Sequence, residues 1–309
     1  MPYKSLSAPR RVESLDAEVC GAAAFDGAGL VAMVASSPAR CGFVPIASGT
    51  NKVINLSLER GDEVAFLSRD VALVRSDGDL WAVIDIHHRA KFERVATNVR
   101  ALCSRASGER ALALSWEGHA YEATMSGYEV AARSFALRGN VKLADVGPTD
   151  TFVVVEVGGG LELRMHPGAT PEPGANGRAQ LPSEASKFDR LKGGMALSVL
   201  YKRGANEACL VSQIGGRLHA KMIDVGAPIA CAATSETSLV VAFEDGRAAL
   251  FTGDAIKNAS DGSSLAATHT LALGARGEPT TMVVTTKGSS CVWVGTANGE
   301  IIRVSLPRK

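Results

Sequence analysis

Three glutamates, Glu18, Glu63 and Glu278, each stand at the start of a short apolar run. Carboxylate oxygens at the ends of neighbouring strands could coordinate a hard cation together, or they could meet a basic partner. Solvated surface acids are the simplest interpretation, because charged side chains mostly stay exposed. The choice depends on whether the fold brings the starts of these three runs together.

The histidines and cysteines do not form a metal-binding pattern. His87 and His88 lie in a basic connector, and neighbours on a strand would point to opposite faces. We expect a surface loop there, with contact to an acidic partner as the alternative. No two cysteines have the spacing of a zinc knuckle, so we expect small buried hydrophobes in a reducing compartment. The cysteines are Cys20, Cys41, Cys103, Cys209, Cys231 and Cys291.

Sequence motifs for known reactions are absent. The chain contains no GxxxxGK[ST], HExxH or GxSxG motif and no GxGxxG between a strand and a helix. The glycines at 158–160 favour a hairpin turn over a phosphate-binding loop. We therefore predict a protein without catalytic residues, metal site or cofactor.

Composition sets limits on the class of protein. Of 309 residues, 46% are hydrophobic and 21% are charged, which supports a core and excludes wholesale disorder. A net charge of +1 argues against an obligate nucleic-acid binder. No apolar run reaches the roughly 20 residues of a membrane helix, and the polar opening segment lacks a secretory signal. We expect a cytoplasmic protein, with the nucleus as the alternative and no membrane contact.

A repeated hairpin pattern organises the chain. An apolar run, a glycine-containing turn and a second apolar run recur at intervals of 40, 41, 45, 42 and 53 residues. A four-stranded propeller blade takes roughly 40–45 residues. Asp-Gly and Asn-Gly turns favour type I′ geometry. Gly215 and Gly216 are predicted to join the third and fourth strands of the fifth unit. The recurring turns centre on Gly78, Gly118, Gly159, Gly204, Gly246 and Gly299, with an earlier turn near Pro38.

The repeat predicts an all-β, seven-bladed propeller of four-stranded antiparallel blades, with residues 1–309 as one domain. The last unit supplies only three strands. We expect the segment around residues 12–15 to add the fourth strand, completing the blade that contains residues 300–306. Such closure removes sheet edges that would invite aggregation.

Two segments interrupt the repeat, each between the third and fourth strands of its unit. Residues 164–186 are rich in Pro, Gly and Ala, and residues 253–264 are similar but shorter. We expect mobile loops, because long insertions cost little in closure entropy. Partner-binding loops are the alternative.

The segments GTANGEIIRVSL and FEDGRAALFTG resemble the step into the third strand of WD40 propellers. The chain departs from that pattern in lacking the opening Gly-His and the closing Trp-Asp. The segment VKLADVGPTDTFVVVEVGGGLELR resembles repeats of the regulator of chromosome condensation, without that family's Gly-Gln-Leu-Gly stretch.

Three functions follow from these patterns. The first, by analogy of fold, is a non-enzymatic platform for protein–protein interaction, as a propeller subunit of a larger intracellular complex. The second is a regulator that resembles guanine-nucleotide exchange factors for small GTPases, as the second resemblance implies. The third is a propeller enzyme with a metal at the mouth of its channel, where the glutamates would be ligands.

Partner-binding residues are predicted at one end of the blades. Turns from second to third strands share that end with the starts of the first strands. Carboxylates with one aromatic suit a basic partner that carries an apolar anchor. For Trp116, packing between neighbouring blades is the competing expectation. The predicted contacts are Asp77, Trp116, His119, Asp245, Glu63 and Glu278.

Overall fold

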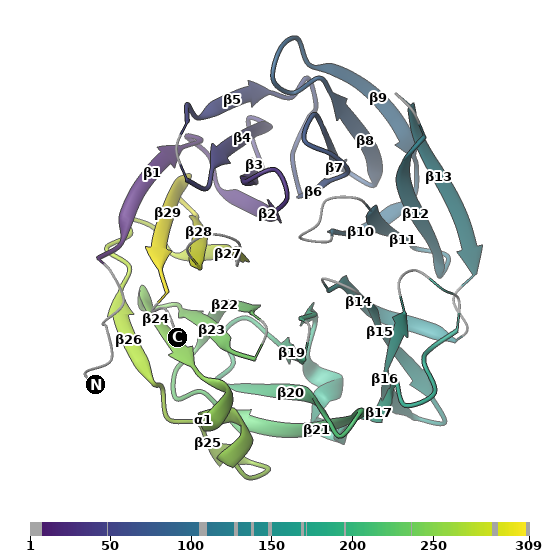
Figure 1. Cartoon of the computed structure of the whole chain (residues 1–309), viewed down its shortest axis with the longest axis vertical. Helices are drawn as coiled ribbons and strands as arrows, with labels where there is room; N and C mark the ends of the chain where they lie inside the picture. The colour runs from purple at the N-terminus through teal and green to yellow at the C-terminus, as the bar shows by residue number, and fades with distance from the viewer. Residues whose placement is uncertain are drawn as a thin grey trace. The chain divides into compact units, whose positions relative to one another are not determined.

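Strands dominate the computed structural model of the chain (Figure 1). They form seven sheets of four antiparallel strands, and one sheet gains a fifth strand. Among the described residues the helices are α1 (Gly253–Asn258) and the 3₁₀ helix η1 (Ser183–Lys187). The structure describes residues 8–47, 49–104, 110–126, 129–136, 139–147, 150–167, 170, 172–194, 196–235, 237–285 and 290–306.

Met1–Ala136 and Gly274–Lys309 form one compact unit, which holds four of the sheets. Their inner strands β27, β2, β6 and β10 lie side by side in that order. One sheet has β2 (Val19–Phe25), β3 (Leu30–Ala35), β4 (Arg40–Pro45) and β5 (Lys52–Asn55). The next has β6 (Glu63–Phe66), β7 (Val71–Ser76), β8 (Asp79–Ile84) and β9 (Lys91–Ala96). The third has β10 (Val99–Ser104), β11 (Arg110–Ser115), β12 (His119–Ser126) and β13 (Glu129–Ala136). The fourth, here called the seam sheet, has β27 (Pro279–Thr285), β28 (Cys291–Thr296), β29 (Glu300–Ser305) and β1 (Arg10–Ser14).

Leu137–Leu273 form the second compact unit, with three sheets. One has β14 (Asn140–Val146), β15 (Asp150–Val157), β16 (Gly160–Pro167) and β17 (Arg178–Gln180). The next has β18 (Arg190–Lys192), β19 (Leu197–Tyr201), β20 (Glu207–Ile214), β21 (Arg217–Asp224) and β25 (Ser263–Ser264). The last has β22 (Ile229–Thr234), β23 (Leu239–Phe243), β24 (Arg247–Phe251) and β26 (His269–Ala272).

Burial explains why the second strand of a sheet is apolar throughout while the outer strand alternates. Every residue of β3, β23 and β28 is buried. Alternate residues of β3 pack against the seam sheet and against the sheet of β6–β9, so both of its faces are covered. The outer strands β5 and β26 alternate between half-buried and exposed residues, as strands with one solvated face do. The apolar runs of the sequence therefore mark the inner strands of each sheet.

The turns differ partly from the predicted type. Asp77 and Gly78 have φ of 46° and 83°, as a two-residue type I′ turn requires. Gly215 and Gly216 have φ of 56° and 78° and join β20 to β21, which confirms the predicted second turn. The turns ending at Gly246 and Gly299 have three residues, and only the glycine has positive φ. A type I turn followed by a left-handed glycine accounts for this geometry.

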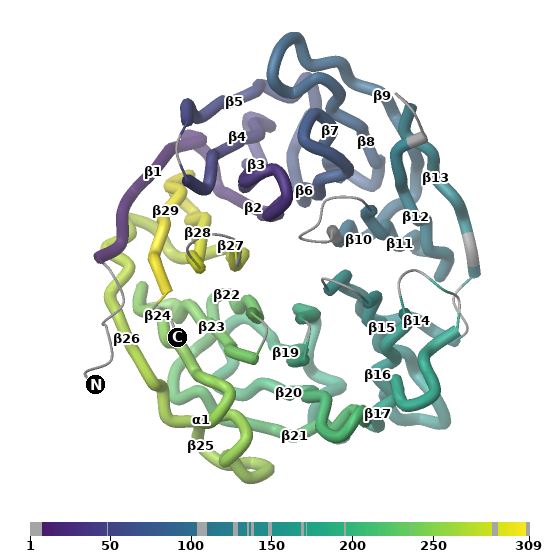
Figure 2. Tube along the Cα trace, in the orientation of Figure 1, coloured from purple at the N-terminus to yellow at the C-terminus, as the bar shows by residue number. Residues whose placement is uncertain are grey.

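The N-terminal strand completes the seam sheet, as predicted. Strand β1 pairs antiparallel with β29, from Arg10 opposite Arg303 to Ser14 opposite Glu300. Figure 2 shows β1 in purple beside β29 in yellow. Just after β1, Leu15 is fully buried, and its N–H donates to the carbonyl of Gly299 at 2.9 Å.

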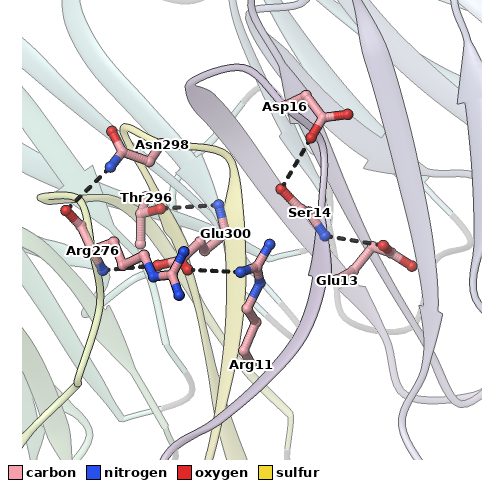
Figure 3. A network of polar contacts seen from close by, with 8 residues as sticks. All are labelled: Arg11, Glu13, Ser14, Asp16, Arg276, Thr296, Asn298 and Glu300. Carbon is pink, nitrogen blue, oxygen red and sulfur yellow. Dashed lines mark hydrogen bonds and ion pairs between the residues drawn. The ribbon is translucent and has the colours of Figure 1, made fainter.

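A buried carboxylate joins the parts of this seam (Figure 3). Glu300 is 5% exposed, and its Oε1 lies 3.3 Å from a guanidinium nitrogen of Arg11 in β1. Its Oε2 accepts a hydrogen bond from the backbone N–H of Arg276 at 2.9 Å. The backbone N–H of Glu300 donates to Thr296 Oγ1 at 3.0 Å. One side chain therefore links β1, β29 and the segment before β27.

The insertion at 253–264 is not the predicted loop. It forms α1 and then β25, which pairs parallel with β21 of the neighbouring sheet. Lys221 Nζ donates to the carbonyls of Ile256 and Ala259 at the end of α1. Ile256 and Leu265 are buried. The buried side chains of Ile256 and Leu265, together with the hydrogen bonds from Lys221, therefore hold this insertion against the sheet.

The insertion at 164–186 is also ordered over most of its described residues. It supplies β17 and η1, and Ala185 and Leu181 join the core of their unit. His166, at the end of β16, is 3% exposed. Its Nδ1 lies 3.0 Å from the carbonyl oxygen of Thr170, while its Nε2 is buried without a hydrogen-bond partner among the described residues.

Replacement of His166 by Phe is expected to reduce the loss of stability at low pH. Burial, assisted by the charge of Arg164, lowers the pKa of His166 below 6.5, although Thr170 and Glu172 act in the opposite direction. The unfolded chain then binds more protons than the folded chain, so the contribution of His166 is complete above about pH 6.5 and declines below it. Urea unfolding at several pH values from 7 to 5 measures this slope. An equal slope in the variant and the wild type would contradict the assignment.

All six cysteines are free thiols. Five are buried, which confirms their predicted place in the core, and Cys20 is half-buried. Burial raises the pKa of Cys209 to about 12. A thiol with so high a pKa holds its proton at neutral pH and is a poor nucleophile.

Candidate functional site

The turn between β11 and β12 exposes a large aromatic side chain. Trp116 is 69% exposed, so the expectation that it packs between blades is wrong. The preceding residue, Ser115, is the last buried residue of β11. Its Oγ accepts hydrogen bonds from the N–H groups of Glu117 and His119 at 3.2 and 3.0 Å. The turn closes on that hydroxyl, which leaves Trp116 outside the core.

A neighbouring loop fixes this turn from the side. The N–H of Trp116 donates to the carbonyl of Asn98 at 3.1 Å, and Asn98 Nδ2 donates to Glu117 Oε1 at 2.8 Å. Asn98 has φ of 60°, which asparagine tolerates better than most residues. The next residue, Val99, donates its N–H to the carbonyl of Gly78 at 2.7 Å. Two adjacent residues thus tie the β11–β12 turn to the β7–β8 turn.

We call these residues the tip cluster. It contains two exposed carboxylates and an exposed indole, and hydrogen bonds hold the backbone of both turns. Such an arrangement can bury an aromatic anchor and pair with cationic groups, and its backbone is already ordered before binding. The tip cluster consists of Asp77, Asn98, Trp116, Glu117 and His119.

A network of ion pairs centred on a buried carboxylate binds the backbone of the tip cluster. The N–H of Asp77 donates to Asp62 Oδ2 at 3.1 Å. Asp62 is buried and pairs with Arg60 at 2.6 Å and with Arg75 at 3.1 Å. Because two guanidinium groups surround this carboxylate, its charge is compensated despite burial.

Glu63 is bound within the fold. Its Oε2 accepts from Arg75 Nε at 2.7 Å and from the backbone N–H of Leu102 at 2.7 Å. This carboxylate therefore links β6 to the neighbouring β10. Its position at the start of a first strand agrees with the prediction, while its role as a partner contact stays a prediction.

The other predicted carboxylates lie in different surroundings. Glu18 is exposed just before β2, and Glu278 is half-buried just before β27. Asp245 lies in the other unit and pairs with Arg247 at 2.6 Å, and hydrogen bonds from Arg247 lower the pKa of Asp245. Within the described part of the chain, no group of three or more His, Cys, Asp or Glu could hold a metal ion. The structure thus adds no support for the metal-enzyme alternative.

His87 and His88 lie in the connection from β8 to β9, as predicted. His88 Nδ1 lies 2.7 Å from Asp85 Oδ1, and that hydrogen bond lowers the pKa of Asp85. Lys52 Nζ donates to the carbonyl of His88 at 3.1 Å. These hydrogen bonds stabilise the connection as a local turn.

The sequence matches no family model and no curated protein. Among solved structures, the WD40 domain of Pan2 from Neurospora crassa resembles the chain with a TM-score of 0.68. The match covers 100% of this chain and 98% of that chain, at 9% sequence identity. The chain has the fold of a WD40 β-propeller. At this identity the similarity concerns the fold alone, and it confirms the predicted seven-bladed class.

In this propeller the tip cluster belongs to two adjacent blades, those of β6–β9 and β10–β13. It lies at the end where second strands turn into third strands. Asp77, Trp116 and His119 were predicted for this end, whereas Asn98 was missed. The sequence feature that could have indicated Asn98 is the two-residue connection between β9 and β10, because so short a connection requires a residue with a left-handed backbone.

Among the described residues, none of the helices has the length and apolar character needed to cross a membrane.

Proposed function

We propose that this propeller is a non-enzymatic protein–protein interaction module, one subunit of a larger assembly, which holds its partner at the tip cluster. The observation that carries the proposal is the exposed indole of Trp116 on a turn whose backbone is tied to the adjacent blade. Exposed tryptophans on ordered backbone are frequent energetic centres of interfaces. The WD40 fold supports the same class of function by analogy.

The partner surface that fits this site is basic and carries an apolar pocket or side chain. Asp77 and Glu117 stand on either side of the bridge formed by Asn98. Cationic groups of a partner would meet these exposed acids, while the indole supplies the apolar contact. Because the backbone of both turns is hydrogen-bonded before binding, little ordering entropy is lost.

The double variant Trp116→Ala, His119→Ala is expected to weaken the main partner by about 1–3 kcal/mol. Its thermal midpoint should stay near that of the wild type, because the indole contributes little to the core. Immobilised protein exposed to an extract of the native source, with quantitative mass spectrometry of what is retained, identifies the partner and measures its loss.

Ile214→Ala is the matched control, since Ile214 is 54% exposed at the end of β20, next to the turn from the third to the fourth strand. The control should retain the partners of the wild type. Equal retention by the double variant, with loss in Ile214→Ala, would contradict the proposal. Unfolding of the double variant would show that Trp116 stabilises the blade instead.

A further inference from the structure

The outer strand β13 presents a long, regular sheet edge. All eight residues from Glu129 to Ala136 pair with β12, and their register has no bulge. The outer strands β1, β5, β9, β17 and β26 have three to six residues. Short or charged edges are the usual protection against strand addition. β9 carries Lys91, Glu93 and Arg94, whereas β13 has two charged residues in eight.

The chain itself covers the other outer strand of this length. β21 also has eight residues and pairs with β20 without a bulge. The insertion at 253–264 lies along its edge, where Gly262 donates its N–H to the carbonyl of Met222 at 2.9 Å. The N–H of Met222 donates to Asp261 Oδ1 at 2.7 Å, and that of Leu265 to the carbonyl of Asp224 at 2.7 Å. A long outer edge in this propeller thus accepts an added segment.

The same register shows which groups of β13 face outward. In β21, Arg217 pairs with Ile214 across the turn. The backbone groups that face outward belong to Met222 and Asp224, which lie five and seven residues after Arg217. In β13, Glu129 pairs with Ser126, and these two are separated in sequence by two residues, as Ile214 and Arg217 are. Because the backbone groups of an antiparallel strand alternate in direction, the N–H and C=O groups of four residues of β13 point away from β12. These residues are Val130, Ala132, Ser134 and Ala136. In the described part of the chain, no other strand forms hydrogen bonds with their outward backbone groups.

The charges of β13 are complementary to those of a second copy of the strand. Glu129 and Arg133 are both exposed and lie two residues on either side of Ala131. In an antiparallel pair centred on Ala131, each Glu129 lies opposite Arg133 of the other copy. Within the sheet, Arg133 already lies opposite Glu122, which pairs with Arg110 at 3.0 Å. The second copy would extend a row of alternating charges.

We propose that two copies of this protein associate through antiparallel pairing of their β13 edges, with Ala131 on the two-fold axis. Val130 and Ala132 of one copy exchange backbone hydrogen bonds with Ala132 and Val130 of the other. Glu129 and Arg133 form the two symmetric cross-strand ion pairs. Opposite charges in directly facing positions stabilise a strand pair, and like charges destabilise it.

Sedimentation equilibrium over a wide range of concentrations tests the proposal. The wild type should show a reversible monomer–dimer equilibrium. Glu129→Arg and Arg133→Glu should each weaken the dimer about tenfold, because each places like charges opposite one another twice. An equimolar mixture of the two variants should restore it, and so should the double variant, since both recover opposite charges.

Two further variants separate edge pairing from general surface effects. Ala132→Pro removes an outward N–H and should abolish the dimer, while an outer strand tolerates proline in the blade. Arg217→Glu makes the same charge change at an exposed position of β21 and should leave the dimer unchanged. A wild type that stays monomeric at every concentration would overturn the proposal. So would a dimer that the single charge reversals do not weaken.

Discussion

Deletion of residues 1–16 is expected to cost most of the stability of the unit that holds the seam sheet, and to cause aggregation. The deletion removes β1, the buried side chain of Leu15 and the Arg11 partner of buried Glu300. Loss of a buried leucine costs about 2–5 kcal/mol, and the backbone hydrogen bonds between β1 and β29 and the ion pair of Glu300 are lost as well. These losses are a large part of the stability of an ordinary domain, about 5–15 kcal/mol.

Thermal unfolding and light scattering of the truncated protein measure both effects. The exposed edge of β29 is the expected site of association, because its backbone groups lose their partners. Arg10→Ala, at an exposed position of β1, is the control and should behave like the wild type. A truncated protein that is monomeric and unfolds at the wild-type temperature would show that β1 does not complete the blade.

Gly299→Ala is expected to destabilise the protein far more than Gly118→Ala. Both glycines end three-residue turns, with φ of 82° and 79°. A left-handed alanine costs about 1–2 kcal/mol in either turn. At Gly299 a Cβ would also lie 2.8 Å from backbone atoms of Asp16 and Ala17, whereas nothing lies within 4 Å at Gly118.

Overpacking of this kind adds about 1–3 kcal/mol, because the atoms that must move belong to the backbone of the N-terminal segment. Chemical denaturation of the two variants gives the difference directly. Equal losses at the two positions would mean that the N-terminal segment shifts freely away from the turn. That result would also weaken the account of the truncation.

The repeat could be predicted from the sequence because glycine has a specific steric role in these hairpins. Asp77 and Gly78 mark a two-residue turn, and the paired Gly215 and Gly216 mark another, as the structure confirms. The missing fourth strand of the last unit likewise indicated the pairing of β1 with β29. Local turn chemistry and strand counting carry this information without knowledge of distant contacts.

The features that the sequence did not reveal depend on tertiary contacts. Composition suggested a mobile loop at 253–264, but Ile256 and Leu265 become buried only when the segment meets β21. The hydrogen bond that ties the backbone of Trp116 to Asn98 comes from a neighbouring loop. The contact of Glu63 with Arg75 and Leu102 spans two sheets. None of these partners can be found by reading the flanking residues.

The pairing of β1 with β29 also imposes an order on folding during synthesis. Arg10 leaves the ribosome long before its partner Arg303 is made. Contacts between residues so far apart in sequence form slowly, because a long loop must close first. Until then β1 waits unpaired while the intermediate blades fold in turn. Pairing of β1 with β29 is therefore the last step in building the seam sheet, because β29 must first be made.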